Sequence, residues 1–169
     1  MSSDENWKRV LNELDYEGLQ PDRLQTCITV MERVRDNGYA FNMNVWVAVP
    51  RWGDDVEILE SELHQCGAAA CFAGWLASSV EWLEVPGCGS YSLGEPAIRR
   101  DHELFYGHEA INVFLGIRHQ SDVGSYLVDP GLALYAGLTG PGAIKPQHVI
   151  DRLIYIQQIN FGGDHERQQ

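Results

Sequence analysis

The sequence has no apolar run that reaches the roughly 18 to 20 residues a membrane-spanning helix needs. Its start, MSSDENWKRV, also lacks the basic-then-apolar pattern of a secretory signal. Basic residues are scarce: 12 Lys and Arg stand against 24 Asp and Glu, giving a net charge of −12. Such a charge repels nucleic-acid phosphates and anionic membrane surfaces. We therefore expect a cytoplasmic protein that binds neither nucleic acid directly nor membranes.

Several motifs are missing as well. No glycine cluster is followed by Lys-Ser or Lys-Thr, which argues against nucleotide hydrolysis by a P-loop mechanism. No internal repeat and no linker divides the 169 residues. A chain of this length can bury a sufficient core without a metal or disulfide. We expect a single domain over 1–169, with frayed ends at about 1–5 and 161–169.

Amphipathic helical patterns are what the chain does have. In PDRLQTCITVMERVRDNG the apolar residues recur at helical spacing, and Asn37-Gly38 ends the pattern. The inward positions of this helix are Leu24, Cys27, Ile28, Met31 and Val34. A last helix follows Pro146, with Val149, Ile150, Leu153, Ile156 and Ile159 facing inward. Residues 39–53 are rich in aromatic and β-branched side chains, which favours a short extended element.

The middle of the chain contains the most apolar segment. Almost every residue from 67 to 83 is small or apolar, which predicts a buried central helix. Glycines and prolines then predict a loop over 84–96, and helical patterns return over 102–117 and 121–128. Ser121 is the expected N-cap of the latter helix, which should end before Pro130. The predicted fold is mainly α, with a minor extended element around this central helix.

The stretch HQCGAAACFAGW, residues 64–75, offers three chemical interpretations. Cys66 precedes the predicted helix, where helix amides favour a thiolate nucleophile. The QCG entry resembles that of papain-like cysteine hydrolases, and this resemblance implies a downstream base. The best available base is His108, oriented by Asp122 or Asn112.

Zinc binding is the second interpretation, with His64, Cys66, Cys71 and Cys88 as ligands. Thiols five positions apart on one helix point roughly 140° away from each other, so Cys66 would have to lie outside it. The third interpretation needs only packing: the glycines and alanines keep the helix thin, and the reduced thiols fill small core spaces. We favour packing, and we expect no cofactor and no metal.

One dense acidic stretch, DDVEILESE, gathers five carboxylates within nine residues. They belong to Asp54, Asp55, Glu57, Glu60 and Glu62. One interpretation is a solvated face that keeps the protein soluble. The other is a surface offered to a basic partner, including one that mimics a nucleic-acid backbone.

Three segments, together with the last helix, resemble a family of small uncharacterised proteins from bacteriophages and mobile elements. They are FNMNVW, CGAAACFAGW and EAINVFLGI, and their order and approximate spacing agree with that family over about two-thirds of the chain. Family members carry F-x-M-x-x-W, then C-G-(T/S)-x-x-C-x-A-G-W, then an L-G-L segment. This sequence departs from the pattern at Ala68 and Ile117. The resemblance implies a viral or mobile-element origin and transfers no catalytic residue.

The sequence therefore predicts a non-enzymatic accessory protein of phage type. It would act in counter-defence or another host interaction, in the cytoplasm of the host cell, by presenting its acidic surface to a basic host or defence protein. Two alternatives stay open: a cysteine hydrolase with Cys66 as nucleophile, and a protein that sequesters a small ligand or nucleotide. The ligand would bind at the glycine-rich loop over 86–96.

Overall fold

The computed structural model describes residues 3–44, 47–48, 69–91, 95–135, 137–138 and 142–162. Helices prevail, in agreement with the predicted fold class. They are α1 (Ser3–Glu13), α2 (Pro21–Asp36), α4 (Phe72–Ser78), α5 (Val80–Leu83), α6 (Gly107–Leu115), α7 (Asp122–Val128), the short 3₁₀ turn η1 (Ala133–Tyr135) and α8 (Pro146–Phe161). The strands are β1 (Val47–Ala48), β2 (Ala69–Ala70), β3 (Cys88–Tyr91), β4 (Glu95–Arg100) and β5 (Glu103–Tyr106).

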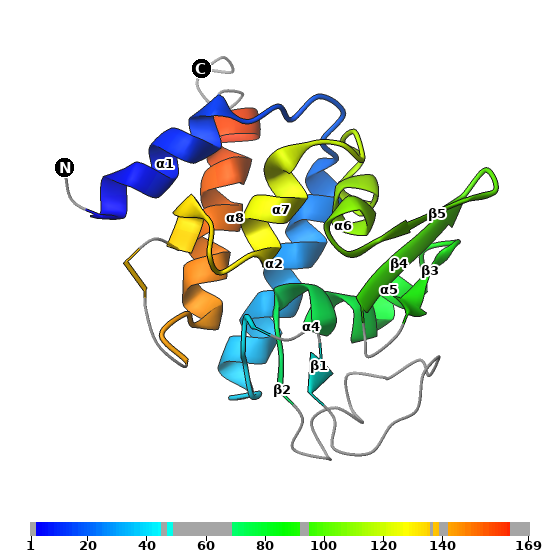
Figure 1. The fold of residues 1–169 in the computed structure, drawn as a ribbon, viewed down its shortest axis with the longest axis horizontal. Helices are drawn as coiled ribbons and strands as arrows, with labels where there is room; N and C mark the ends of the chain where they lie inside the picture. The colour runs from blue at the N-terminus through cyan, green and yellow to red at the C-terminus, as the bar shows by residue number, and fades with distance from the viewer. Residues whose placement is uncertain are drawn as a thin grey trace, which may run out of the picture.

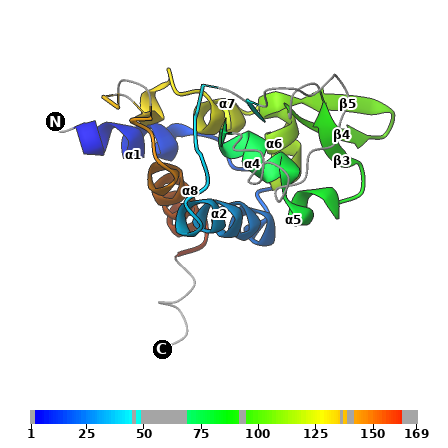
Figure 2. The same ribbon diagram turned by 90° about the horizontal axis from the view of Figure 1, so that it is seen from below.

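Helices α2 and α8 pack side by side and form one layer of the molecule (Figure 2). All five predicted inward positions of α2 are buried, and Asn37 follows as its C-cap. Gly38 adopts a φ of 63°, so the predicted Asn-Gly stop is confirmed. In α8 four of the five predicted inward residues are buried. The prediction is wrong for Ile159, which is 38% exposed because it lies in the last turns of α8, beyond the core.

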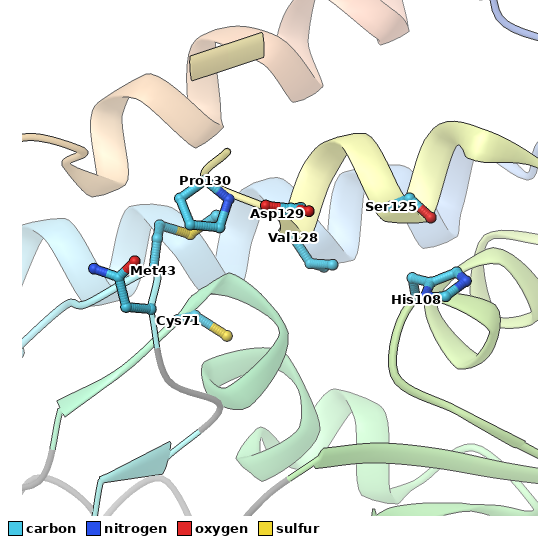
Figure 3. A pocket seen from close by; sticks show the side chains of 8 residues that line it. Met43, Cys71, His108, Ser125, Val128, Asp129 and Pro130 are labelled. Atoms are coloured by element: carbon cyan, nitrogen blue, oxygen red, sulfur yellow. The ribbon is translucent and has the colours of Figure 1, made fainter. Parts of the chain in front are cut away.

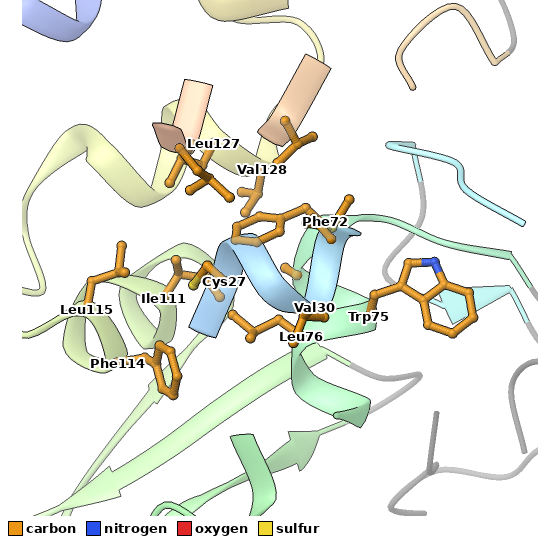
Figure 4. Packing of buried hydrophobic residues seen from close by; sticks show 14 of the residues in the cluster. Cys27, Val30, Phe72, Trp75, Leu76, Ile111, Phe114, Leu115, Leu127 and Val128 are labelled. Atoms are coloured by element: carbon orange, nitrogen blue, oxygen red, sulfur yellow. The ribbon is translucent and has the colours of Figure 1, made fainter. Parts of the chain in front are cut away.

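Helix α4 lies in the centre of the core, where each of its residues is buried (Figures 1 and 4). The predicted buried helix is thus confirmed, but its predicted start at 67 is wrong. Ala69 and Ala70 pair with β1 in an antiparallel ladder, and α4 begins only after Cys71. The helix also breaks at Ser79, whose hydroxyl accepts a hydrogen bond from the Trp82 amide at 3.2 Å and starts α5.

A three-stranded antiparallel sheet, in the order β3-β4-β5, packs against α4 and α6 (Figure 1). It corrects two predictions. The expected loop over 84–96 contains β3 and the start of β4, and the expected helix over 102–117 begins with β5. Strands β4 and β5 are joined by Asp101 and His102, which both have positive φ, as a tight two-residue hairpin requires.

Helices α6 and α7 complete the core above α2 (Figure 4). The predicted cap is confirmed, because the Ser121 hydroxyl accepts a hydrogen bond from the Val123 amide at 3.3 Å. Helix α7 ends at Val128, before Pro130 as predicted. Within the described ranges, no helix has the combined length and apolarity that crossing a bilayer would require.

Candidate functional site

A cavity of about 510 Å³ runs along α7. Its walls come from the segment after α2, the start of α4, the start of α6 and the C-terminal end of α7. The described residues that line it are Met43, Asn44, Cys71, His108, Ser125, Val128, Asp129 and Pro130. Its volume falls within the range of small-molecule sites.

The two ends of the cavity differ in chemistry (Figure 3). Met43, Cys71 and Pro130 gather at one end, whereas Ser125 and His108 lie at the other. Val128 and Asp129 lie between the ends. A ligand that fits along the cavity would therefore contact mainly apolar side chains at one end and polar side chains at the other.

Cys71 closes the floor of the apolar end. It is the N-cap of α4, and its Sγ accepts a hydrogen bond from the Gly74 amide at 3.4 Å. The side chain is buried, and burial raises the pKa of the thiol to about 11. Hydrogen bonds from nearby backbone amides, that of Gly74 included, lower this pKa but do not offset the burial. At neutral pH Cys71 is therefore a protonated thiol and a poor nucleophile.

His108 reaches the cavity because α6 starts directly from strand β5. Gly107 makes this abrupt transition with a φ of 53°, a conformation that favours glycine. Nearby, partial burial raises the pKa of the Glu95 carboxyl, and the charge of His108 opposes that rise.

Asn112 fixes the position of α6 against α7. Its Nδ2 donates hydrogen bonds to the carbonyls of His119, at 2.9 Å, and Ser121, at 2.6 Å. Its Oδ1 accepts one from the Gly124 amide at 2.8 Å. Gly124 must lack a side chain, because a Cβ would lie 2.3 Å from the carbonyl oxygen of His108. This close contact sets His108 and Ser125 on opposite walls of one cavity.

Asp129 is exposed at the C-terminal end of α7. Its Oδ1 accepts a hydrogen bond from the Gly131 amide at 2.8 Å, which holds the turn through Pro130. Within the described part of the chain this carboxylate has no ion-pair partner. A negative charge at a helix C-terminus also adds to the negative pole of the helix instead of offsetting it.

The structure separates the residues of the predicted cysteine-hydrolase set. His108 lines this cavity, whereas Asp122 lines a different one at the other end of α7. Asn112 is fully buried, and its side-chain amide makes hydrogen bonds with α7 and with the loop before it. Cys66 lies outside the described residues, as do His64 and the acidic stretch from Asp54 to Glu62.

Of the four predicted zinc ligands, the structure describes Cys71 and Cys88. Cys88 is half-buried on β3, and burial raises its pKa to about 11. Among the residues that can be described, no three His, Cys, Asp or Glu side chains are grouped as metal ligands would be. The glycine-rich segment proposed as a ligand loop is instead largely taken up by the β3-β4 hairpin.

Sequence analysis missed most of the cavity wall. Ser125 and Asp129 had no motif around them, and Met43 was noted only as part of the FNMNVW family pattern. The one local signal was Pro130, which marks the end of α7. No sequence pattern predicts that the C-terminal end of α7 and His108 line the same cavity.

A second cavity, of about 380 Å³, lies at the N-terminal end of α7. It is lined by Glu13, Leu14, Asp15, Arg118, Gln120, Ser121 and Asp122. Arg118 supplies a positive charge to this wall and also forms an ion pair with Glu17. The acidic groups of this cavity therefore share its wall with a cation of the chain itself.

The chain matches no known family model, no curated protein and no solved structure in the comparisons made.

Proposed function

We propose that the protein is a non-enzymatic binding protein that presents its acidic surface to a basic partner protein. The observation that carries this proposal is the excess of exposed carboxylates without a counter-charge. The chain has a net charge of −12, and ion pairs such as Arg9–Glu13 and Arg33–Glu81 occupy only some of its acids. Within the described ranges, the exposed carboxylates that have no ion-pair partner include Asp15, Asp22, Glu84, Asp101, Glu103, Asp122, Asp129 and Asp151.

Unpaired surface charge of one sign steers an oppositely charged partner and suppresses association with acidic molecules. The resemblance to phage and mobile-element proteins supports a host or defence protein as that partner. Asp54, Asp55, Glu57, Glu60 and Glu62 form the densest acidic stretch in the sequence and are the proposed contact.

The test compares two variants with the same change in charge. In the first, Asp54, Asp55, Glu57 and Glu60 are replaced by lysine. In the matched control, the dispersed acids Asp22, Glu84, Asp101 and Asp151 are replaced instead. We expect the wild-type chain to retain a basic protein from bacterial lysate at low salt and to release it at moderate salt. The first variant should lose this protein, and the control should only weaken its retention. Retention that ignores salt, or equal loss in both variants, would contradict the proposal.

A cysteine hydrolase is the second candidate, and the position of His108 in the wall of a ligand-sized cavity favours it. In that function Cys66 is the nucleophile and His108 its base. The measurement is the rate of alkylation by iodoacetamide near neutral pH, followed separately for each thiol by mass spectrometry. Cys66 must react much faster than Cys27, Cys71 and Cys88. Slow reaction of all four thiols would eliminate this candidate.

A further inference from the structure

The cavity along α7 combines one uncompensated carboxylate with an apolar wall. Among its described lining residues Asp129 is the acid, and none is a lysine or arginine. The thiol of Cys71 is uncharged, and Met43, Val128 and Pro130 offer carbon and sulfur surface. The second cavity differs, because Arg118 is among its described lining residues. Among the described lining residues of these two cavities, only Asp129 is a carboxylate with no lysine or arginine in the same wall.

The neighbourhood adds to this negative potential. The last carbonyls of α7 lie beside Asp129. At the His108 end the Ser125 hydroxyl can accept a hydrogen bond. A hydrogen-bond acceptor at one end and an apolar wall at the other suit a ligand with a polar donor and a hydrocarbon part.

We propose that this cavity binds an organic cation, an ammonium or guanidinium group on a short apolar stem. The stem lies against Met43, Val128 and Pro130, and the cation pairs with the free Oδ2 of Asp129. Two sources present this chemistry: a free amine, or a lysine or arginine side chain of a partner. The second source rests on the proposed function, because it makes the cavity part of the contact with a basic protein.

Agmatine, which carries a guanidinium and an ammonium on a four-carbon stem, is the probe, and butanol is its uncharged control. Binding is measured by calorimetry to wild-type chain, Asp129→Asn and Asp151→Asn. Asparagine at 129 keeps the acceptor for the Gly131 amide and removes the charge. Asp151 is an exposed acid of α8 that accepts a hydrogen bond from Gln147, so Asp151→Asn makes the same chemical change away from the cavity.

The expected result is binding of agmatine but not of butanol. Asp129→Asn should raise the dissociation constant by at least about tenfold, as loss of a hydrogen bond between charged groups does, whereas Asp151→Asn should leave it within about twofold. No binding of agmatine at millimolar concentration, or equal weakening in both variants, would overturn the proposal.

Competition then identifies the source. If agmatine releases the retained partner protein, the cavity receives a side chain of that partner. If agmatine binds without releasing it, or if no partner protein is retained at all, the ligand is a free amine. In that case the cation site stands even where the proposed protein-binding function fails, so the two failures are distinguishable.

Discussion

A cavity lies at each end of α7, and the two cavities differ in the charged side chains that line them. At the N-terminal end Asp122 lies with Glu13 and Asp15, but Arg118 is in the same wall. At the C-terminal end Asp129 lies with Met43 and Pro130, and no lysine or arginine is among the described lining residues. The first cavity contains more carboxylates, but in the second the carboxylate has no lysine or arginine among the described residues that share its wall.

The helix itself increases this contrast. An acid in the first turn of a helix is stabilised by the free amides there, whereas an acid at the last turn faces carbonyl oxygens. Asp122 occupies the favourable end of α7 and Asp129 the unfavourable one. The difference teaches that the number of acids does not identify a cation site in this protein. The carboxylate that neither the helix nor a neighbouring cation stabilises is the better indicator.

The largest expected effect comes from replacing Asn112, whose side chain holds α6 against α7. Asn112→Ala leaves the Gly124 amide and the carbonyls of His119 and Ser121 without their hydrogen-bond partner. We expect the free energy of unfolding to fall by about 3 kcal/mol, measured by urea denaturation. Asn160→Ala, on the exposed face of α8, is the control and should cost less than about 1 kcal/mol. Equal losses would mean that Asn112 does not hold the two helices together.

The next effect tests the floor of the C-terminal cavity. A thiol with a pKa of about 11 is roughly 0.1% ionised at pH 8, whereas a free cysteine is about a quarter ionised. Alkylation of Cys71 by iodoacetamide should therefore be about two hundredfold slower in the folded protein than in denaturant, and its rate should rise with pH toward 11. Reaction at the rate of a free thiol would place a thiolate in this cavity and reverse the charge argument for its apolar end.

The smallest effect separates the two ends of α7. Ser121→Ala removes the N-cap bond to Val123 and the bond from the hydroxyl to the Asp15 carbonyl. We expect the free energy of unfolding to fall by about 1 kcal/mol in Ser121→Ala. Ser121→Thr should keep most of the wild-type stability, because threonine can also cap a helix. The affinity for agmatine should not change, because Ser121 lines the cavity at the N-terminal end of α7. A marked loss of affinity in Ser121→Ala would show that the two ends are coupled.

Local patterns predicted the helices well where neighbours in sequence decide the structure. The apolar stripe from Leu24 to Val34 forms the buried face of α2. Ser121, a favoured N-cap residue, marks the start of α7. The extended element predicted over 39–53 contains β1, but β2 to β5 were missed because pairing decides them. Ala69 and Ala70 have no strand preference of their own, but they pair with Val47 and Ala48.

The β4-β5 hairpin shows a further limit of local patterns. Its turn uses Asp101 and His102 in place of the Asn-Gly pair that usually marks such turns. Leu104 and Phe105 then fit a helical pattern as well as a strand, so the predicted helix extended too far toward the N-terminus. His108 was identified as a candidate, but its cavity partners Ser125 and Asp129 come from another helix. The close approach of Gly124 to His108 and the hydrogen bonds of Asn112 bring the two helices together.

The central claim is that a cation enters the cavity at the C-terminal end of α7 and not the one at its N-terminal end. Titration of the labelled protein with agmatine, followed by amide chemical shifts, tests it directly. The amides of His108, Ser125, Val128 and Asp129 should shift and saturate with one dissociation constant, while those of Ser121 and Asp122 stay unchanged. Shifts centred on Ser121 and Asp122, or spread over all exposed acids without saturation, would contradict the claim.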